Sequence, residues 1–374
     1  MQAGNLGSIP SHYRAIDSIF SRSRQLDINP DFTRLLKALR GGQPDRVPLL
    51  ELIVDQEIKA AFIGRSITSF ADEVEFWYRA GYDCIPIYPE APTIWFYNKS
   101  RTDTIIEDSY TASGLRRWAS EGKGIIQDWS DLEQHPLPTL DQIDFSYFEE
   151  AAHTLPAGMG LIGAWGDIFT YAWEGMGFVE FAFALKRKPD FVVHLFQQLG
   201  QLAVQIYEAL LSYESVKALW YSDDLAYRTG FLVSPDIYRQ YLFPWLKKIG
   251  DLCHRAGRPY LFHSDGVLWD VMSDLVACGF NALQPIEPNA MDIREVKRRY
   301  GNYFCLIGNI DVDVLSRSTP EIVRHQVRTL LHDIAPGGGY CLGSGNTVPS
   351  YVRLENYRAL IEEGFSSGIY PIEV

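Results

Sequence analysis

The sequence predicts an α/β protein built as a single (β/α)8, or TIM, barrel, and three observations support this fold class. From Val216 onward, short apolar runs alternate regularly with amphipathic helical patterns. Five apolar runs in this half and three in the first half give eight strands, the number that closes such a barrel. A doubly wound open sheet is the competing fold. It usually carries a G-x-G-x-x-G turn after an early strand, and no such turn follows the first or second predicted strand here.

The first half of the chain is predicted to hold an N-terminal arm, two helices and three strands. Residues 1–31 are polar and mixed, with one weak helical pattern, and are expected to form a helical arm on the barrel of residues 32–374. Glycines stop both helical patterns, as they commonly do at helix ends. The predicted helices cover residues 32–40 and 69–80, and the predicted strands cover residues 47–53, 82–87 and 159–163.

Residues 90–148 interrupt the alternation. They contain short alternating runs and turn residues, include the Pro-rich Pro136-Leu137-Pro138 toward their end, and show no good helical pattern. This stretch is too long for an ordinary loop. It is therefore predicted to be a β-rich insertion after the second strand, either a lid or a set of surface hairpins.

The second half is predicted to consist of strands and helices in regular order. Ser234 and Pro235 are typical of a helix start, as N-cap and first helical residue. The predicted strands cover residues 216–221, 259–263, 281–284, 303–308 and 340–342. The predicted helices cover residues 191–213, 235–255, 267–278, 293–300, 320–333 and 354–363.

Composition limits the cellular compartment and the classes of partner that are expected for this protein. The 374 residues include 34 Lys or Arg and 47 Asp or Glu, a formal net charge of −13, which argues against nucleic acid or an anionic membrane as partner. Five scattered cysteines without C-x-x-C spacing are typical of free thiols in a reducing compartment. With no apolar run of membrane-spanning length and no signal peptide, we expect a soluble cytoplasmic protein with a small-molecule substrate. A homodimer is compatible with the sequence.

Polar side chains follow the predicted strands, where the active site of such a barrel lies. We expect them to line one acidic cleft, which can bind a cation, supply acids and bases with raised pKa values, or orient a polar substrate. The catalytic candidates are Asp224, His263, Asp265 and Glu287. The substrate-binding candidates are Glu51, Asp55, Trp165, Asp223, Asn309, Asp311 and Asn346, and Asp167 lies beside them.

His263 is the centre of this prediction, because a buried strand runs directly into it and Asp265 follows. An imidazole beside carboxylates suits zinc or a similar divalent ion. A histidine at a strand end can also be a hydrogen-bonded structural residue. One of Asp223 and Asp224 is expected to cap the following turn. No P-loop is present, and no G-x-S-x-G serine elbow joins a predicted strand to a helix, so covalent hydrolysis is not indicated.

Several of these segments resemble the uroporphyrinogen decarboxylase superfamily, and the resemblance runs from about Phe32 to the C-terminus. The superfamily is a (β/α)8 barrel that includes the tetrapyrrole decarboxylase and cobalamin-dependent methyltransferases that carry zinc. The matching segments are Asp45-Arg46-Val47-Pro48, Ser222-Asp223-Asp224-Leu225, Ser234-Pro235 with Tyr238, Phe262-His263-Ser264-Asp265-Gly266, Pro285-Ile286-Glu287-Pro288 with Met291-Asp292, Gly308-Asn309-Ile310-Asp311, Gly337-Gly338-Gly339-Tyr340 and Leu354-Glu355-Asn356.

The two branches differ at positions that this chain can be compared with. In the decarboxylase branch, the motif Pro-x-Trp-x-Met-Arg-Gln-Ala-Gly-Arg follows the first strand, and its arginines bind substrate carboxylates. Here residues 47–55 hold no arginine and two acids, Glu51 and Asp55, the wrong charge for a polycarboxylate. In the methyltransferase branch, His-x-Cys follows the fifth strand and a further Cys follows the eighth. This chain keeps His263, has Asp265 for the first Cys, and has Asn346 roughly where the second would fall.

The resemblance thus implies a metal site with oxygen ligands and points away from methylation of a thiol. The leading hypothesis is a corrinoid-dependent methyltransferase that moves a methyl group from a small O- or N-methyl compound to a corrinoid on a partner protein. His263, Asp265 and one of Asp223 and Asp224, with Asp224 preferred, would hold zinc (Zn²⁺) or polarise the substrate. The partner would dock over the acidic barrel mouth, with residues 90–148 as lid.

Two alternatives stay open. The first is a metal-independent decarboxylase or lyase acting on a small or tetrapyrrole acid, with His263 as proton donor and Asp224 stabilising developing positive charge. The second is a non-enzymatic carrier of a corrinoid or tetrapyrrole.

Overall fold

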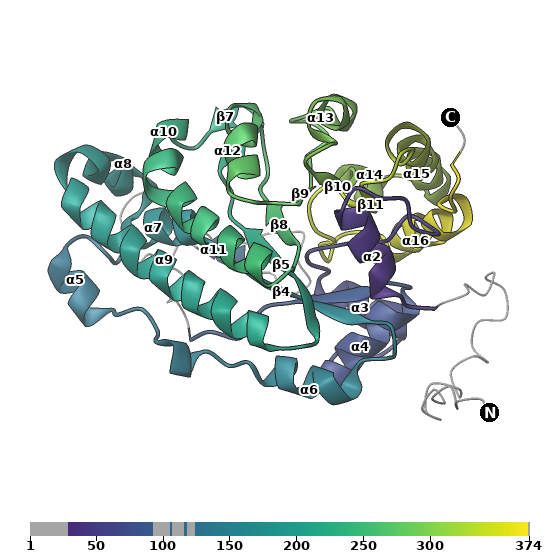
Figure 1. Cartoon of the computed structure of the whole chain (residues 1–374), viewed down its shortest axis with the longest axis horizontal. Helices are drawn as coiled ribbons and strands as arrows, with labels where there is room; N and C mark the ends of the chain where they lie inside the picture. Colours follow the sequence, from purple (N-terminus) through teal and green to yellow (C-terminus); the bar gives the residue numbers. More distant parts are fainter. Residues whose placement is uncertain (1–28, 93–104, 107–115, 118–123, 373–374) are drawn as a thin grey trace.

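The computed structural model describes residues 29–92, 105–106, 116–117 and 124–372. Seven parallel strands form one curled sheet with helices packed around it, in the order β1-β4-β5-β8-β9-β10-β11 (Figure 1). The predicted (β/α)8 fold class is confirmed, and seven of the eight predicted strands are strands. They are β1 (Cys84–Ile87), β4 (Gly160–Gly166), β5 (Val216–Ser222), β8 (Tyr260–His263), β9 (Ala282–Gln284), β10 (Cys305–Ile310) and β11 (Tyr340–Ser344).

The eighth predicted strand, residues 47–53, is not a regular strand. It pairs with β11 through isolated bridges, Leu49 with Leu342 and, just beyond, Val54 with Val348. The Leu50 amide donates to Leu342, and the Leu342 amide donates to the carbonyl of Pro48, each at 2.9 Å. Pro48 has no amide hydrogen to give to a ladder, which explains why the pairing stays partial.

The interior of the barrel nevertheless receives side chains from all eight segments. Alternate residues point inward along each strand, so that every segment contributes to one buried apolar cluster. Its strand members include Leu50, Leu52, Cys84, Ile162, Ala164, Ala218, Trp220, Leu261, Ala282, Cys305, Ile307 and Cys341.

The N-terminal end of the barrel is covered by α2 (Phe32–Leu39), which begins at the N-cap Asp31. The Phe32 amide donates to the carbonyl of Gly158, just before β4, at 2.7 Å, and the Asp31 amide donates to Asp83, just before β1, at 3.0 Å. Leu35 of α2 is fully buried in the interior cluster. The barrel is therefore closed at this end by an apolar helix face.

The main hydrophobic core lies between the sheet and the outer layer of helices. The long helices α9 and α11 lie side by side against the sheet (Figure 1). The helices are α3 (Gln56–Ile63), α4 (Phe70–Arg79), α7 (Ile168–Met176), α8 (Phe178–Arg187), α9 (Pro189–Ser212), α10 (Pro235–Ile237), α11 (Phe243–Arg255), α12 (Met272–Ala277), α13 (Ile293–Tyr300), α14 (Val312–Arg317), α15 (Pro320–Ile334) and α16 (Leu354–Ser367).

Several helices differ from the prediction. The predicted helix 235–255 is divided by a π-helical turn at Tyr238–Leu242, because Pro244 lacks the amide that an α-helical bond would use. The helices α3, α7, α8 and α14 were not predicted. Each has ten residues or fewer, so its apolar pattern covers too few turns to show a clear period. Among the described residues, every helix is too short or too polar to cross a bilayer.

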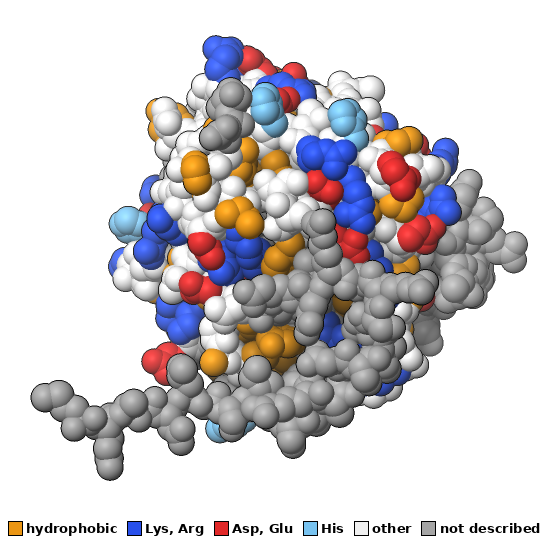
Figure 2. All heavy atoms as spheres, turned by 90° about the vertical axis from the view of Figure 1, so that its right-hand side faces the viewer, with side chains coloured by type: hydrophobic (Ala, Val, Ile, Leu, Met, Phe, Trp, Pro, Cys, Tyr) orange, Lys and Arg blue, Asp and Glu red, His pale blue; other side chains and the backbone are white. Residues whose placement is uncertain are grey.

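The outer surface of α15 and α16 carries many charged side chains. Figure 2 shows basic and acidic side chains interspersed on the face that lies to the right in Figure 1, the side on which these helices lie. Arg324 of α15 contacts Glu362 of α16 at 2.5 Å and Glu363 at 3.6 Å. The two last helices are thus joined on their outer side by ion pairs.

The described part of the predicted insertion differs from the β-rich expectation. Residues 124–148 contain α5 (Trp129–Gln134), a 3-10 turn at Leu140–Gln142 and the start of α6 (Ser146–Thr154). Asp128 accepts hydrogen bonds from the amides of Ser130 and Asp131 and so starts α5 locally. Two short antiparallel strands, β2 (Ile105–Ile106) and β3 (Arg116–Arg117), form a pair. The rest of the insertion and the arm at 1–28 lie outside the described residues.

Leu35→Ala is predicted to destabilise the barrel, because it opens a cavity in the interior cluster at the end that α2 covers. We expect the free energy of unfolding to fall by about 2 to 5 kcal/mol, measured by urea denaturation. Lys37→Ala, an exposed change in the same helix, should stay within about 0.5 kcal/mol of wild type. Equal effects of the two changes would contradict this account of α2.

Candidate metal and substrate site

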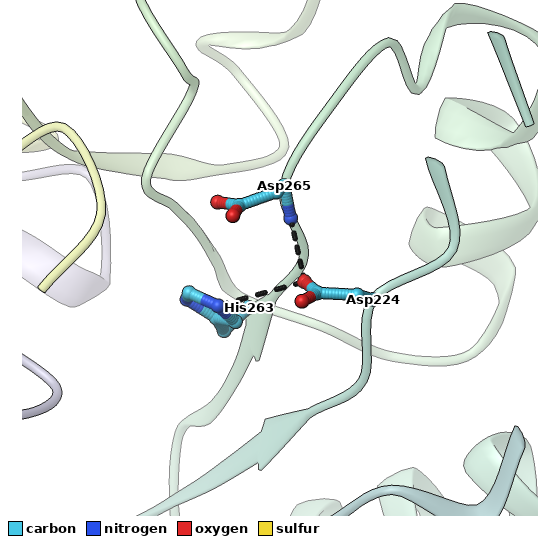
Figure 3. A group of neighbouring side chains, drawn as sticks. All are labelled: Asp224, His263 and Asp265. Carbon is cyan, nitrogen blue, oxygen red and sulfur yellow. Dashed lines mark hydrogen bonds and ion pairs between the residues drawn. The ribbon is translucent and has the colours of Figure 1, made fainter. Parts of the chain in front are cut away.

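Three of the predicted site residues meet at the C-terminal rim of the sheet. His263 ends β8, Asp265 follows it, and Asp224 follows the end of β5; their side chains point to one space (Figure 3). The His263 Nε2 lies 3.8 Å from Asp224 Oδ1, and the Asp265 amide donates to the same oxygen at 3.0 Å. One donor atom from each residue lies within 4.8 Å of the others.

The sheet register explains this meeting. The parallel strands β5 and β8 pair Ser222 with His263. Residues just beyond these two therefore leave the sheet at the same height. Asp224 is half exposed, whereas His263 is buried.

Asp265 has one satisfied and one unsatisfied oxygen. Its Oδ2 accepts a hydrogen bond from Asn346 Nδ2 at 2.5 Å, while its Oδ1 is buried without a protein partner. Burial raises the pKa of Asp265 to about 6; His263 opposes this, while Asp224 and Glu287 add to it. A buried oxygen without a partner is costly, and a cation would provide one.

The chemistry of this donor set fits a divalent cation. One imidazole nitrogen and two carboxylate oxygens are ligands that zinc accepts, with room for substrate or water at a further position. The residues that could hold the ion are Asp224, His263 and Asp265. Whether they bind one stays a prediction.

Gln284 is a site residue that the sequence reasoning missed. It is fully buried at the end of β9, where the register pairs it with His263. Its Oε1 contacts the Nδ1 of His263, and its Nε2 donates to the carbonyl oxygen of Asn346 at 2.6 Å. The only signal for it in the sequence is a polar residue that ends the apolar run Ala282-Leu283.

Asp223 lies in the structural part of the fold and not in the cleft. Its two oxygens accept hydrogen bonds from the amides of Phe169 and Thr170, at 2.7 and 3.0 Å, from the Thr170 hydroxyl at 2.8 Å and from the Tyr221 hydroxyl at 2.7 Å. It thereby caps the first turn of α7, where a carboxylate is favoured. Burial raises its pKa to about 6. The prediction that Asp223 binds substrate is corrected, since both oxygens are occupied within the protein.

Asp167, at the start of α7, is a further acid near Asp223 and Asp224. It adopts a left-handed backbone conformation, with φ of 63°. Burial, together with Asp223, Asp224 and Glu174, raises the pKa of its carboxyl well above the usual value. A neutral acid at this position can donate a hydrogen bond.

Glu51 and Trp165 point into the helix layer instead of the cleft. Their neighbours Leu50 and Ala164 occupy the inward positions, so alternation turns these two side chains outward. The Ser344 amide donates to Glu51 Oε1 at 2.7 Å, and the Ser344 hydroxyl lies 2.6 Å from Oε2. Burial raises the pKa of Glu51 to about 8. Both residues are corrected from substrate binding to structural roles.

Two further predicted residues also serve the framework. Asp55 precedes α3 and accepts a hydrogen bond from the amide of Ser350 at 2.8 Å. Asn309 is buried and donates to the carbonyl of Ile286 at 2.8 Å. These contacts join neighbouring loops at the rim. Asn309 also borders a cavity there together with Asp311, so contact of Asp55 and Asn309 with substrate stays a prediction.

Glu287 and Asp311 line open space beside the three clustered residues. A cavity of about 260 Å³ is bordered by Glu287, Asp311, Asn346, Tyr351 and Arg228. Glu287 Oε2 accepts from the Gly266 amide at 3.2 Å, and its Oε1 accepts from Arg228 Nε. Asp311 is also the N-cap of α14.

Arg228 is a second residue that the sequence reasoning missed. It lies in the turn between the short strands β6 (Ala226–Tyr227) and β7 (Gly230–Phe231). It also borders a second cavity, of about 400 Å³, which Asp265 and Glu287 line as well. It is the only Lys or Arg among the described residues that line these two cavities. No strand-end pattern marks it, because it belongs to a hairpin outside the barrel.

Comparison with known proteins places the fold and these residues in context. The family model described as Uroporphyrinogen decarboxylase (URO-D) matches residues 123–364. The chain is 27% identical over 279 residues to the uroporphyrinogen decarboxylase of Thioalkalivibrio sulfidiphilus, covering 69% of this chain and 76% of that protein. It is 28% identical over 257 residues to the uroporphyrinogen decarboxylase of Sodalis glossinidius, covering 63% and 70%. A solved structure of a methyltransferase from Methanosarcina mazei has a similar fold, with a TM-score of 0.63 at 18% identity over 89% of this chain and 97% of that one.

The variants Asp223→Asn and Asp224→Asn are predicted to differ in stability, because the first changes a structural carboxylate and the second a carboxylate at the cleft. In Asp223→Asn, the side-chain NH₂ group would face N–H and O–H groups that donate hydrogen bonds to the wild-type carboxylate. We therefore expect a loss of about 1 to 3 kcal/mol in the free energy of unfolding. Asp224→Asn, at an exposed side chain, should change it by less than about 0.5 kcal/mol. Urea denaturation of both variants measures this, and the reverse order would contradict the assignment.

Glu51→Gln is predicted to flatten the pH dependence of stability. The folded pKa of Glu51, about 8, lies above the ordinary value of 4.5, so the folded chain binds this proton more tightly than the unfolded chain. The resulting stability is present below pH 4.5 and is lost as the pH rises through 8, at up to about 1.4 kcal/mol per pH unit. Denaturation from pH 5 to 8 should show a smaller decline in the variant than in wild type. The exposed change Glu57→Gln should leave the decline unaltered.

Proposed function

The chain belongs to the uroporphyrinogen decarboxylase family, and we propose that it is a methyltransferase that passes a methyl group from a small O- or N-methyl compound to a corrinoid carried by a partner protein. The observation that carries this proposal is the cluster of Asp224, His263 and Asp265, with one buried oxygen that lacks a partner. The fold is shared with a protein named a methyltransferase, which supports the same choice.

In this proposal the clustered residues are metal ligands. The His263 Nε2 and one oxygen each from Asp224 and Asp265 would hold zinc or a similar divalent ion, which when bound supplies a Lewis acid for the leaving oxygen or nitrogen of the substrate. Oxygen ligands in place of thiolates favour the hard oxygen or nitrogen of an ether or amine over a thiol.

The reaction breaks the bond between the methyl carbon and the oxygen or nitrogen of the substrate. The methyl group goes to the reduced corrinoid, while the leaving atom keeps the electron pair and takes up a proton. Asp167 is the acid that could supply this proton, because burial and the neighbouring acids raise the pKa of its carboxyl well above the usual value.

The dimensions and charge of the cleft support a small substrate. The two cavities at the rim, of about 260 and 400 Å³, are near the lower end of the usual size range for ligand pockets. Asp265, Glu287 and Asp311 line the two cavities at the rim, with Arg228 as the basic residue among the described lining. Such a surface attracts a cationic or neutral compound and disfavours a polycarboxylate.

A carboxy-lyase is the second candidate, because the relatives at 27% and 28% identity are named uroporphyrinogen decarboxylases. His263 would then donate a proton to the carbon that loses carbon dioxide, and the exposed Asp224, 3.8 Å away, would stabilise its charged form. This reaction needs no metal, which makes it separable from the first candidate by experiment.

The proposed function predicts that one zinc ion binds per chain and that methyl transfer to reduced cobalamin depends on it. His263→Ala should weaken zinc binding more than about 100-fold, because it removes a ligand and not only its support. His254→Ala, at an exposed histidine of α11, is the matched control. Competition with a chromophoric chelator measures the affinity, and loss of methyl from a panel of methyl ethers and methylamines measures the reaction.

The outcomes separate the candidates. Transfer that stops on chelation and returns with zinc supports the methyltransferase. Release of carbon dioxide from small acids that persists after complete chelation, and stops in His263→Ala, overturns it in favour of the lyase.

A further inference from the structure

We infer that Gln284 and Asn346 are positioning residues that orient His263 and Asp265 before any ligand arrives. Gln284 fixes the hydrogen of the His263 ring on Nδ1, so that Nε2 faces the cleft as an acceptor, and Asn346 holds Asp265 by one oxygen so that the other stays free. The metal-binding part of this inference rests on the proposed function. The orientation of the ring and of the carboxylate does not.

The orientation of the Gln284 amide follows from its partners. The backbone carbonyl oxygen of Asn346 can only accept a hydrogen bond, so the Gln284 atom 2.6 Å from it is the amide nitrogen. The other end of the amide is then the oxygen Oε1, which also can only accept. This oxygen faces the Nδ1 of His263.

The tautomer of His263 follows in turn. Because Gln284 Oε1 accepts, Nδ1 of His263 must carry the hydrogen, and in the neutral ring Nε2 then holds a lone pair. Nε2 is the ring atom that lies 3.8 Å from Asp224. Gln284 is fully buried and His263 nearly so, which leaves little water to replace the Gln284 bond. A hydrogen bond of this kind sets the tautomer of metal-binding histidines in general.

Asn346 completes the arrangement from the loop after β11. Its carbonyl oxygen holds Gln284, and its side-chain Nδ2 donates to Asp265 Oδ2 at 2.5 Å. Asp265 Oδ1 remains buried and without a protein partner. One loop residue thus supports both an imidazole and a carboxylate, through different groups. Nε2 of His263 and Oδ1 of Asp265 are left unbound by these supports, in two residues that each offer a donor atom to the same cluster.

The experiment compares Gln284→Leu with Asn346→Ala, because the two changes remove different supports. Gln284→Leu deletes the partner of Nδ1 at nearly constant volume. Asn346→Ala deletes the bond to Asp265 but keeps the backbone carbonyl that holds Gln284. Gln201→Leu, at an exposed position of α9, is the matched control, and thermal unfolding checks that each variant folds.

The first measurement is the nitrogen NMR spectrum of histidine-labelled, metal-free protein at pH 8.5, about two units above the ordinary histidine pKa. His263 is assigned from the spectrum of His263→Ala. Wild type, Asn346→Ala and Gln201→Leu should show the hydrogen on Nδ1, whereas Gln284→Leu should show it on Nε2 or shared between the two. A wild-type ring with its hydrogen on Nε2 would overturn the inference, as would an unchanged spectrum in Gln284→Leu.

The second measurement is zinc affinity by chelator competition. Gln284→Leu and Asn346→Ala should each bind about 10- to 100-fold more weakly than wild type and Gln201→Leu. Unchanged affinity in both variants would overturn the positioning role. If Gln284→Leu does not fold, the Asn346→Ala arm still decides, because it must lose affinity while keeping the tautomer. A wild-type protein with the expected tautomer and no zinc affinity would refute the proposed function and leave the tautomer assignment supported.

Discussion

The geometry of the candidate site depends on the register of three neighbouring parallel strands. Ser222 on β5, His263 on β8 and Gln284 on β9 are consecutive partners in the register. A shift of β8 by one residue would turn His263 toward the outer helices, because side chains alternate between the two faces of a sheet. The apolar interior cluster opposes such a shift, since it would carry Leu261 out of the core, as a shift of β5 would carry Trp220 and a shift of β9 would carry Ala282.

The strand ends could be read from the sequence because the apolar runs are clear and each ends in polar residues. His263, Asp265 and Asp224 were recognisable because they follow neighbouring strands directly. The direction of each side chain was harder to predict. Glu51 and Trp165 belong to runs that are buried on both faces, and nothing in such a run tells which residues face inward. Asp223 and Asp224 are adjacent and chemically identical, and only the position of α7 decides that the first is internal.

Other features depend on tertiary context that a single sequence does not show. The segment at 47–53 is apolar and β-branched enough for a strand, but Pro48 and its place beside β11 leave it with isolated bridges. Gln284 is one amide among many in the sequence, and its role appears only when Asn346 is brought beside it from a loop 62 residues away. Arg228 comes from a hairpin, where period and strand ends give no guidance.

The loop that carries Asn346 also closes the irregular side of the barrel. The Asp55 amide donates to the Val348 carbonyl at 2.9 Å, the Val348 amide donates to Ile53 at 3.0 Å, and Ser350 is bound by Asp55. The residue that aligns the two donor groups is therefore tied, two positions away, to the part of the wall with the fewest regular backbone bonds. Loosening of that wall is therefore expected to disturb His263 and Asp265 together, which links the local stability of the barrel to the geometry of the proposed metal site.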